Sequence, residues 1–210
     1  MMLGALVDPI VGGKILDAGA GSGVLGLMLA QRCITSLVDG VELDPLAYEE
    51  CCENLAKSPY RDRMKAYRVD FLEFEPEIPY TLIVSNPPYY LETNSSSERN
   101  QREKHLSQGE LKAWVMQCKK LLTREGTCWI IFPISMKASV EDIFQDAGFF
   151  VHKIFHLENQ HGKSVRTVFA LTQQALKCET RYIRLRNPEG KYSEEYLELT
   201  QDFHGTPLLK

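Results

Sequence analysis

A short strand, a glycine-rich turn and a helix follow one another near the start of the chain, and this succession constrains the fold more than any other feature. Lys14 to Asp17 is predicted as a buried strand, residues 18–23 (Ala-Gly-Ala-Gly-Ser-Gly) as the turn, and Val24 to about Gln31 as an apolar helix. A strand that enters a helix through a tight glycine turn is typical of a parallel α/β sheet. We therefore predict an α/β protein with helices on both faces of a mostly parallel sheet.

The spacing of the glycines separates this turn from the dinucleotide fingerprint. Gly19, Gly21 and Gly23 are spaced Gly-x-Gly-x-Gly, and Val24 stands where that fingerprint has its third glycine. The turn still lets a ligand approach the backbone closely, and the helix that follows offers free N–H groups to an anion such as a carboxylate. The turn alone is a weak signal for any one ligand.

Carboxylates follow at the ends of the next two predicted strands. The strand Leu37 to Glu42 ends in an acid 19 residues after Gly23, where a carboxylate can accept both hydroxyls of a ribose. The strand Lys65 to Val69 is followed by Asp70 and Phe71, and an acceptor beside an aromatic face suits an adenine ring with its amino group. Asp44, by contrast, is interpreted as the N-cap of a helix that begins at Pro45.

The fourth strand-end motif is Asn86-Pro87-Pro88-Tyr89, directly after the apolar strand Thr81 to Ser85. Two prolines fix the backbone and remove two N–H donors, so their carbonyls have no local partners. Asn86 adds an amide, and Tyr89 adds a flat face for a planar group. The motif suits a planar NH₂ group, and the alternative is a turn that is merely rigid.

Length and composition predict one domain with a small appendage. The chain has 210 residues, of which 44% are hydrophobic, enough for a sizeable core. The composition changes after about Ala175, so we expect a main domain at 1–175 and a C-terminal strand and helix at 176–210 packed on it. No apolar run reaches membrane-spanning length and no secretory signal is visible, which predicts a cytoplasmic protein that does not enter membranes.

The cysteines and histidines do not predict a metal site. The six cysteines include no Cys-x-x-Cys pair, so we expect free thiols, mostly buried. His152 and His156 are predicted on one strand, where about 3.3 Å per residue puts them ~13 Å apart. One metal ion could not bind both.

The net charge of −4 is unevenly distributed. The first 60 residues hold eight acids and three bases, so the other 150 hold 20 acids and 21 bases. Basic residues cluster at 61–65, at 99–104 and at 181–186. Such clusters permit a polyanionic partner, although most are simply solvated. The polar stretch 92–108 is expected to be a binding lid, with a disordered segment as the alternative.

The remaining elements follow from helical and strand periodicity. Ser107 begins a capping box and a helix in which Trp114 is assigned to the core. A strand at 128–133, a helix capped by Ser139 and a hairpin of strands at 150–157 and 166–172 come next. The hairpin ends the sheet with an antiparallel strand. After it we predict a half-exposed strand at 182–186 and a last helix capped by Ser193.

Taken together, these motifs resemble the class I S-adenosylmethionine-dependent methyltransferases, and most closely the bacterial tRNA(Val) adenine-N6-methyltransferases, which modify adenosine 37 beside the anticodon. The resemblance runs from Ile15 to Phe203 and is most specific at 16–23, 41–43, 85–90, 101–103 and 192–196. In that family a segment before the first strand closes over the cofactor, and Leu3-Gly4-Ala5 resembles the end of that segment.

The resemblance implies a Rossmann-like sheet of seven strands with S-adenosyl-L-methionine as cofactor. It implies no metal, the anticodon loop of a tRNA as partner, and a monomer. The implied catalytic residues are Asn86, Pro87, Pro88 and Tyr89. The implied cofactor-binding residues are Asp17, Gly19, Gly21, Gly23, Glu42, Asp70, Phe71 and Asn86. The candidate RNA contacts are Arg99, Arg102, Lys104, Arg184 and Arg186.

Two other functions remain open at this point. Glutamine N5-methyltransferases of peptide release factors share the Asn-Pro-Pro-Tyr motif, because a side-chain amide is also planar, but they usually carry an additional helical domain. A non-catalytic module that binds the cofactor or RNA is the other alternative. Whether methyl transfer occurs, and onto which substrate, distinguishes the three.

Overall fold

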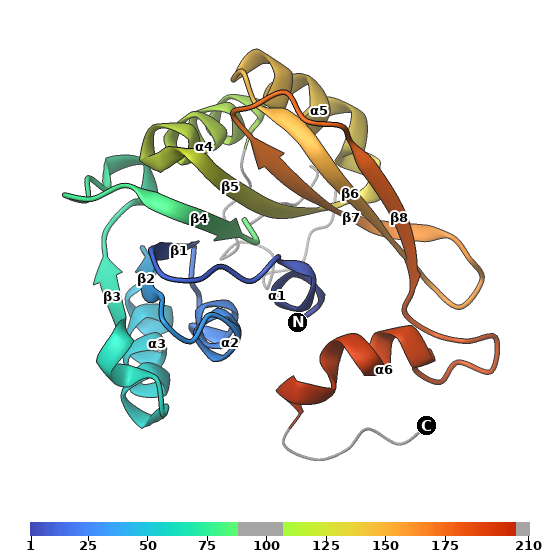
Figure 1. Ribbon diagram of the computed structural model, residues 1–210, viewed down its shortest axis with the longest axis horizontal. Helices are drawn as coiled ribbons and strands as arrows, with labels where there is room; N and C mark the ends of the chain where they lie inside the picture. Colours follow the sequence, from blue (N-terminus) through green and yellow to red (C-terminus); the bar gives the residue numbers. More distant parts are fainter. Residues whose placement is uncertain (88–106, 205–210) are drawn as a thin grey trace, which may run out of the picture.

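The computed structural model describes residues 1–87 and 107–204, which form an eight-stranded sheet with helices on both faces (Figure 1). The strand order is β3-β2-β1-β4-β5-β7-β6-β8. Every neighbouring pair is parallel except those that β7 makes with β5 and β6. The strands are β1 (Lys14–Ala18), β2 (Leu37–Glu42), β3 (Met64–Arg68), β4 (Tyr80–Ser85), β5 (Leu122–Pro133), β6 (Phe150–Glu158), β7 (Ser164–Thr172) and β8 (Glu179–Arg184).

The helices divide between the two faces of the sheet. On one face pack α1 (Met2–Leu6), α2 (Val24–Arg32), α3 (Pro45–Lys57) and α6 (Glu194–Thr200). On the other pack α4 (Gln108–Leu121) and α5 (Lys137–Asp146). Short 3₁₀ turns complete the elements at η1 (Arg61–Arg63), η2 (Phe71–Glu73), η4 (Ile134–Met136) and η5 (Gln201–Phe203).

The central strands are buried on both sides, which explains their continuous apolar sequences. Along β4, Leu82 and Val84 face the layer of α1, α2 and α3, whereas Ile83 between them faces α4 and α5. Trp129 and Phe132 of β5 are divided between the two layers in the same way. Side chains alternate across a strand, so a strand covered on both faces needs apolar residues at every position.

The sequence located most of these elements correctly. The four strands β1 to β4, the cap and proline that begin α3, and the capping box of Ser107 and Glu110 are confirmed. The β6–β7 hairpin and its antiparallel strand are confirmed as well. So is the cap of α6 by Ser193, whose hydroxyl accepts from the Tyr196 N–H. The six cysteines are free, and four of them are buried.

Three expectations need correction. The sheet has eight strands and not seven, because the strand assigned to the C-terminal appendage is β8, which pairs in parallel with β6. Strand β5 begins at Leu122, earlier than predicted. Ser139 does not cap α5, since the helix has already begun at Lys137, and the Ser139 hydroxyl instead donates to the Met136 carbonyl.

Two further expectations concern the lid and the membrane. Nearly all of the predicted lid at 92–108 lies outside the described residues, as do Arg99, Arg102 and Lys104. Within the described ranges, no helix is long and apolar enough to cross a bilayer.

Candidate active site

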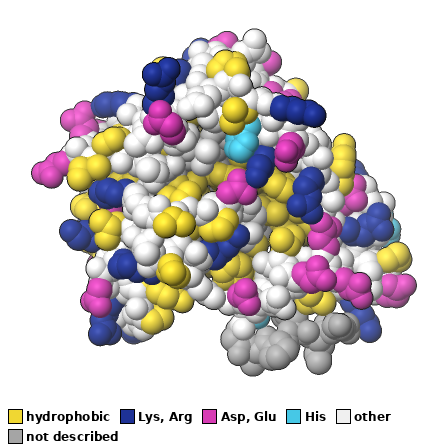
Figure 2. Space-filling view, in the orientation of Figure 1, with side chains coloured by type: hydrophobic (Ala, Val, Ile, Leu, Met, Phe, Trp, Pro, Cys, Tyr) yellow, Lys and Arg dark blue, Asp and Glu magenta, His cyan; other side chains and the backbone are white. Residues whose placement is uncertain are grey.

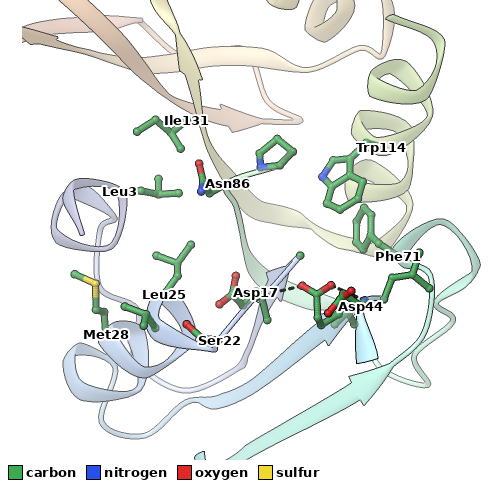
Figure 3. A pocket seen from close by; sticks show the side chains of 18 of the residues that line it. Leu3, Asp17, Ser22, Leu25, Met28, Asp44, Phe71, Asn86, Trp114 and Ile131 are labelled. Carbon is green, nitrogen blue, oxygen red and sulfur yellow. Dashed lines mark hydrogen bonds between the residues drawn. The ribbon is translucent and has the colours of Figure 1, made fainter. Parts of the chain in front are cut away.

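A cavity of about 1340 Å³ lies along the carboxyl ends of the parallel strands, and the predicted strand-end residues meet in it (Figure 3). Its lining includes Asp17, Glu42, Asp70 and Asn86, from the ends of four different strands or the residues directly after them. Ordinary small-molecule pockets measure roughly 300–1,000 Å³. The cavity therefore has room for a cofactor and for part of a second substrate.

The glycine turn forms one wall of the cavity. The N–H groups of Gly19 and Ala20 both donate to the Val41 carbonyl, at 3.0 and 2.9 Å, which attaches the turn to the end of β2. Gly21 has a φ of +54°, and a Cβ built on it meets no atom within 4 Å. The backbone is therefore bare on the side where a side chain would otherwise occupy the cavity.

Glu42 fastens the same wall with both of its carboxylate oxygens. Oε2 accepts from the Gly21 N–H and Oε1 from the Asp44 N–H, each at 2.8 Å. Each carboxylate oxygen has a second lone pair. Glu42 can therefore hold the turn in shape and still accept a hydroxyl donor from a ligand. Asp44, as expected, caps α3 by accepting from the Leu46 and Ala47 N–H groups.

Asp17 is a buried carboxylate with one oxygen unpaired. Its Oδ2 accepts from the Gly26 N–H at 2.7 Å, in the first turn of α2, so it supports the helix that follows the glycine turn. Its Oδ1 is buried and has no hydrogen-bond partner. Burial, reinforced by the nearby Glu42, raises the pKa of Asp17 to about 7 despite that hydrogen bond. Because Asp17 lines the cavity, a cation bound there would favour its charged form.

Aromatic side chains line the cavity next to Asp70, at the end of β3. Asp70 caps η2 by accepting from the Leu72 N–H at 2.9 Å, and the next residue, Phe71, is buried with its ring 4.3 Å from that of Trp114. Gln117 of α4 fixes this segment by donating to the carbonyls of Phe71 and Phe74, at 3.1 and 2.9 Å.

The Asn86-Pro87 turn projects into the middle of the cavity. The Ser85 hydroxyl donates to the Ala18 carbonyl at 2.8 Å, which joins the ends of β4 and β1. Asn86 follows as an exposed residue and Pro87 as a buried one, and both line the cavity. Figure 3 shows Asn86 between Leu3 and Ile131 on one side and Trp114 on the other. Pro88 and Tyr89 lie outside the described residues.

Some predicted site residues are not brought to the cavity. Gly23 does not line it. A Cβ at Gly23 would come within 2.8 Å of Cys51 Sγ and 2.9 Å of Leu55 Cδ1, so this glycine allows α3 to pack against the turn. Arg184, the last residue of β8, and Arg186, just after it, are both exposed, and each already has a partner. Arg184 lies 3.8 Å from Glu158, and Arg186 donates to the Gly190 carbonyl.

Three residues were missed as site residues. Trp114 belongs to the core, as predicted, but it also lines the cavity, and its indole N–H is buried without an acceptor. Asn54 donates to the Ser22 carbonyl at 2.9 Å and so holds the glycine turn from α3. Arg166 lines the cavity from β7. Only Asn54 could have been found from the sequence, as a polar residue on a predicted helix beside the turn.

The site is suited to a cationic, adenosine-like ligand and to a planar amino group. Within the parts of the chain that the structure describes, no three His, Cys, Asp or Glu side chains could hold a metal ion together. The lining instead offers several carboxylates, aromatic faces and a rigid amide turn. These groups can position a substrate and exchange hydrogen bonds with it.

Comparisons with known proteins agree with this geometry. The methyltransferase small domain family matches residues 1–147. The tRNA1(Val) (adenine(37)-N6)-methyltransferase of Vibrio campbellii is 32% identical over 207 residues, covering 97% of this chain and 86% of that protein. The protein of the same name from Pectobacterium carotovorum is 33% identical, covering 91% of this chain and 79% of the relative.

Solved structures agree on the fold. A protein from Agrobacterium tumefaciens described as a predicted O-methyltransferase has a TM-score of 0.72 at 16% identity, covering 95% of this chain and 93% of its own. A TehB-like SAM-dependent methyltransferase from Corynebacterium glutamicum has a TM-score of 0.56 at 19% identity, covering 79% and 82%. The fold is thus that of the class I S-adenosylmethionine-dependent methyltransferases. The chain is a methyltransferase of the methyltransferase small domain family and belongs to the group of tRNA1(Val) (adenine(37)-N6)-methyltransferases.

Proposed function

We propose that this protein transfers the methyl group of S-adenosyl-L-methionine to the N6 amino group of adenosine 37 in tRNA1(Val). The names of its relatives support this substrate. The observation that carries the proposal is the meeting of Asn86-Pro87 with the strand-end carboxylates in one cavity. We further propose that it acts in the cytoplasm as a monomer, and that residues 176–210 are a C-terminal extension of the domain at 1–175, to whose sheet they add β8.

The residues of the cavity fit S-adenosylmethionine. The unpaired, buried Oδ1 of Asp17 calls for a cationic group, and the ligand carries both an ammonium and a sulfonium. Glu42 would accept the ribose hydroxyls, Asp70 the adenine amino group, and Phe71 would pack on the ring. Gly19 and Gly21 would admit the methionine part along the bare backbone.

For the reaction, S-adenosylmethionine supplies an electrophilic methyl group on its sulfonium. The Asn86 side-chain oxygen and the Pro87 carbonyl would each accept a hydrogen bond from one N–H group of the target amino group. These contacts orient its lone pair and stabilise the positive charge that develops on nitrogen. Pro88 would keep the turn rigid, and Tyr89 would stack on the base, which must leave its loop to reach the cavity.

Contacts with the rest of the tRNA are proposed for basic residues. Arg184 and Arg186 are near β8, and Arg99, Arg102 and Lys104 belong to a basic cluster of the sequence. Because Arg186 lies over the Tyr192 ring and holds the 187–191 turn, it also has a structural role. Arg184 is the better residue for testing RNA contact.

Labelled methyl transfer tests the proposed substrate directly. The protein is incubated with labelled S-adenosylmethionine and either tRNA lacking the modification or a peptide release factor. The tRNA is then digested to nucleosides, which identify the modified base, and to oligonucleotides, which locate it, and both are analysed by mass spectrometry. We expect label on N6-methyladenosine at position 37. Label on a glutamine of the release factor instead would replace the tRNA assignment, and label on neither would favour a binding module.

Removing the Glu42 carboxylate should weaken cofactor binding. Glu42→Ala removes the proposed ribose acceptor, and hydrogen bonds to a charged group contribute about 1.5–3 kcal/mol. We expect the dissociation constant of S-adenosylmethionine, measured by calorimetry, to rise by the corresponding roughly 10- to 100-fold. The exposed Glu50→Ala on α3 is the matched control. Unchanged affinity in Glu42→Ala would remove Glu42 from the ribose site.

Trp114 and Trp129 allow a comparison of two identical substitutions. Both indole N–H groups are buried without an acceptor, but only Trp114 lines the cavity. If a cofactor atom accepts from Trp114, Trp114→Phe should weaken S-adenosylmethionine binding about 5- to 10-fold, the effect of one ordinary hydrogen bond. Trp129→Phe should leave the affinity unchanged. Equal affinities in the two variants would remove Trp114 from the cofactor site.

A further inference from the structure

We infer that the half of the cavity beyond Asn86 binds the target nucleotide, with Arg166 contacting a phosphate of the RNA chain next to the flipped base. This inference rests on the proposed function and makes it more specific. It assigns a phosphate-contacting residue on β7, at the cavity, in addition to the contacts proposed above.

Arg166 lies at the edge of the sheet that forms the cavity because β7 runs in the opposite direction to its neighbours. It directly faces Pro133 at the end of β5 and Leu157 near the end of β6. The beginning of an antiparallel strand lies at the same edge as the carboxyl ends of the parallel strands beside it. Arg166 therefore lies at the same edge of the sheet as the carboxylates at the carboxyl ends of β1 to β3.

The two halves of the cavity differ in chemical character. The half near β1, β2 and β3 carries carboxylates from Asp17 to Asp70. The half near α1, β5, β6 and β7 is walled by aliphatic side chains: Leu3, Ile131, Leu157 and Leu185. Leu3 and Ile131 lie beside Asn86 in Figure 3, and Figure 2 shows hydrophobic side chains gathered in the hollow of this face of the molecule. An apolar wall of this kind suits the flat faces of a base.

Arg166 brings a positive charge to this apolar half. Among the described residues that line the cavity, it is the only lysine or arginine. A guanidinium donates two parallel hydrogen bonds to a phosphate, and such charge-assisted pairs are strong. A nucleotide brings both a base for the apolar wall and a phosphate for Arg166. A glutamine side chain brings no anionic group.

The separation of Asn86 and Arg166 matches this occupant. Ser85, just before Asn86, pairs with Ile130 of β5, and Arg166 of β7 faces Pro133. Asn86 is one residue further along than Ser85, so from Asn86, Arg166 is two strands across and two residues along. At about 4.8 Å between strands and ~3.4 Å per residue, the Cα atoms are ~12 Å apart. A nucleotide extended from its amino group to its phosphate, together with the arginine side chain, spans such a distance.

Steady-state kinetics with tRNA test the inference. Arg166→Gln keeps a polar side chain of similar length but removes the charge. We expect KM for tRNA to rise roughly 10-fold or more, with kcat and the affinity for S-adenosylmethionine within a few-fold of wild type. The slope of log affinity against log salt should become shallower by about 0.7–0.9, because one phosphate fewer is neutralised. Arg166→Lys should lie between, because a lysine binds phosphate as a point charge.

Two further measurements test whether the effect of Arg166 comes from its contact with a phosphate. Arg124→Ala removes an exposed cation from β5 outside the cavity, and its KM should match wild type. Adenosine monophosphate should compete with tRNA better than adenosine in the wild type, and this preference should disappear in Arg166→Gln. Unchanged KM and an unchanged preference for the monophosphate, in a protein that methylates tRNA, would overturn the Arg166 assignment alone. A wild-type protein that leaves tRNA unmethylated would overturn the proposed function instead.

Discussion

Replacing Asn86 by alanine should lower kcat for methyl transfer about 10²-fold or more and change the affinity for S-adenosylmethionine by only a few-fold. Asn86 is exposed within the cavity, at the head of a turn that the Ser85 hydroxyl fixes to the end of β1. Its proposed partner is the target amino group, and the contact strengthens as positive charge develops on nitrogen. Single-turnover rates and calorimetry on the same preparations measure the two quantities.

Asn54→Ala is the matched substitution with the opposite expected signature. Asn54 supports the glycine turn from α3 through the Ser22 carbonyl, so its removal should weaken cofactor binding a few-fold. At saturating cofactor the rate should recover. Near-normal kcat in Asn86→Ala would remove Asn86 from catalysis. A fall in cofactor affinity as large as the fall in rate would move Asn86 to the cofactor site.

The sequence predicts well which strand-end residues meet in the cavity, for a physical reason. Strands covered on both faces are continuous apolar runs, so the polar residue that ends each run is conspicuous. In parallel strands those ends meet at one edge. Asp17, Glu42, Asp70 and Asn86 could therefore be expected together in the cavity that they line.

Residues whose position depends on long-range packing could not be predicted in this way. Arg166 lies at the beginning of β7. This end of the strand is at the cavity only because β7 is antiparallel to its neighbours. Trp114 has the spacing of a buried helical residue, and only the folded chain shows that its ring, which lies against that of Phe71, also lines the cavity. Gly23 has the spacing of a ligand-binding glycine, yet the side chains that require it belong to α3.

The pairing of β8 with β6 is another long-range feature. The alternating residues of this segment predict a half-exposed strand but do not say which strand it joins. In the structure the residue after β8 is still joined to the end of β6, because the Leu185 N–H donates to the Glu158 carbonyl at 2.8 Å. The C-terminal strand therefore extends the main sheet, and α6 reaches α1 on the same face as the glycine turn.

Asp17 illustrates how a site can lower the stability of its own fold. Its pKa is about 7 in the folded chain and near 3.8 when exposed, so folding favours the protonated acid. Below pH 3.8 both states are protonated and no penalty arises. The penalty grows with pH and is complete above about pH 7, where it amounts to about 4 kcal/mol on the scale of 1.36 kcal/mol per pKa unit. A cation in the cavity would offset it.

Asp17→Asn should therefore stabilise the ligand-free protein and weaken its cofactor binding. At pH 8 we expect the free energy of unfolding to rise by about 2–4 kcal/mol, less than the full penalty because the Gly26 N–H no longer has a charged acceptor. The increase should shrink towards pH 4. Asp62→Asn, at an exposed position, should change neither quantity. Denaturation at several pH values measures the first effect.

Calorimetry measures the second effect of Asp17→Asn. S-adenosylmethionine should bind at least about tenfold more weakly, since the cation no longer has its buried partner. In the wild type, binding below pH 7 should release a proton from Asp17, which appears as a dependence of the binding enthalpy on the buffer, and this dependence should be absent from the variant. A variant that is more stable but binds as tightly as wild type would mean that the cation lies elsewhere. A variant that is no more stable than wild type at pH 8 would mean that Asp17 does not carry a buried charge.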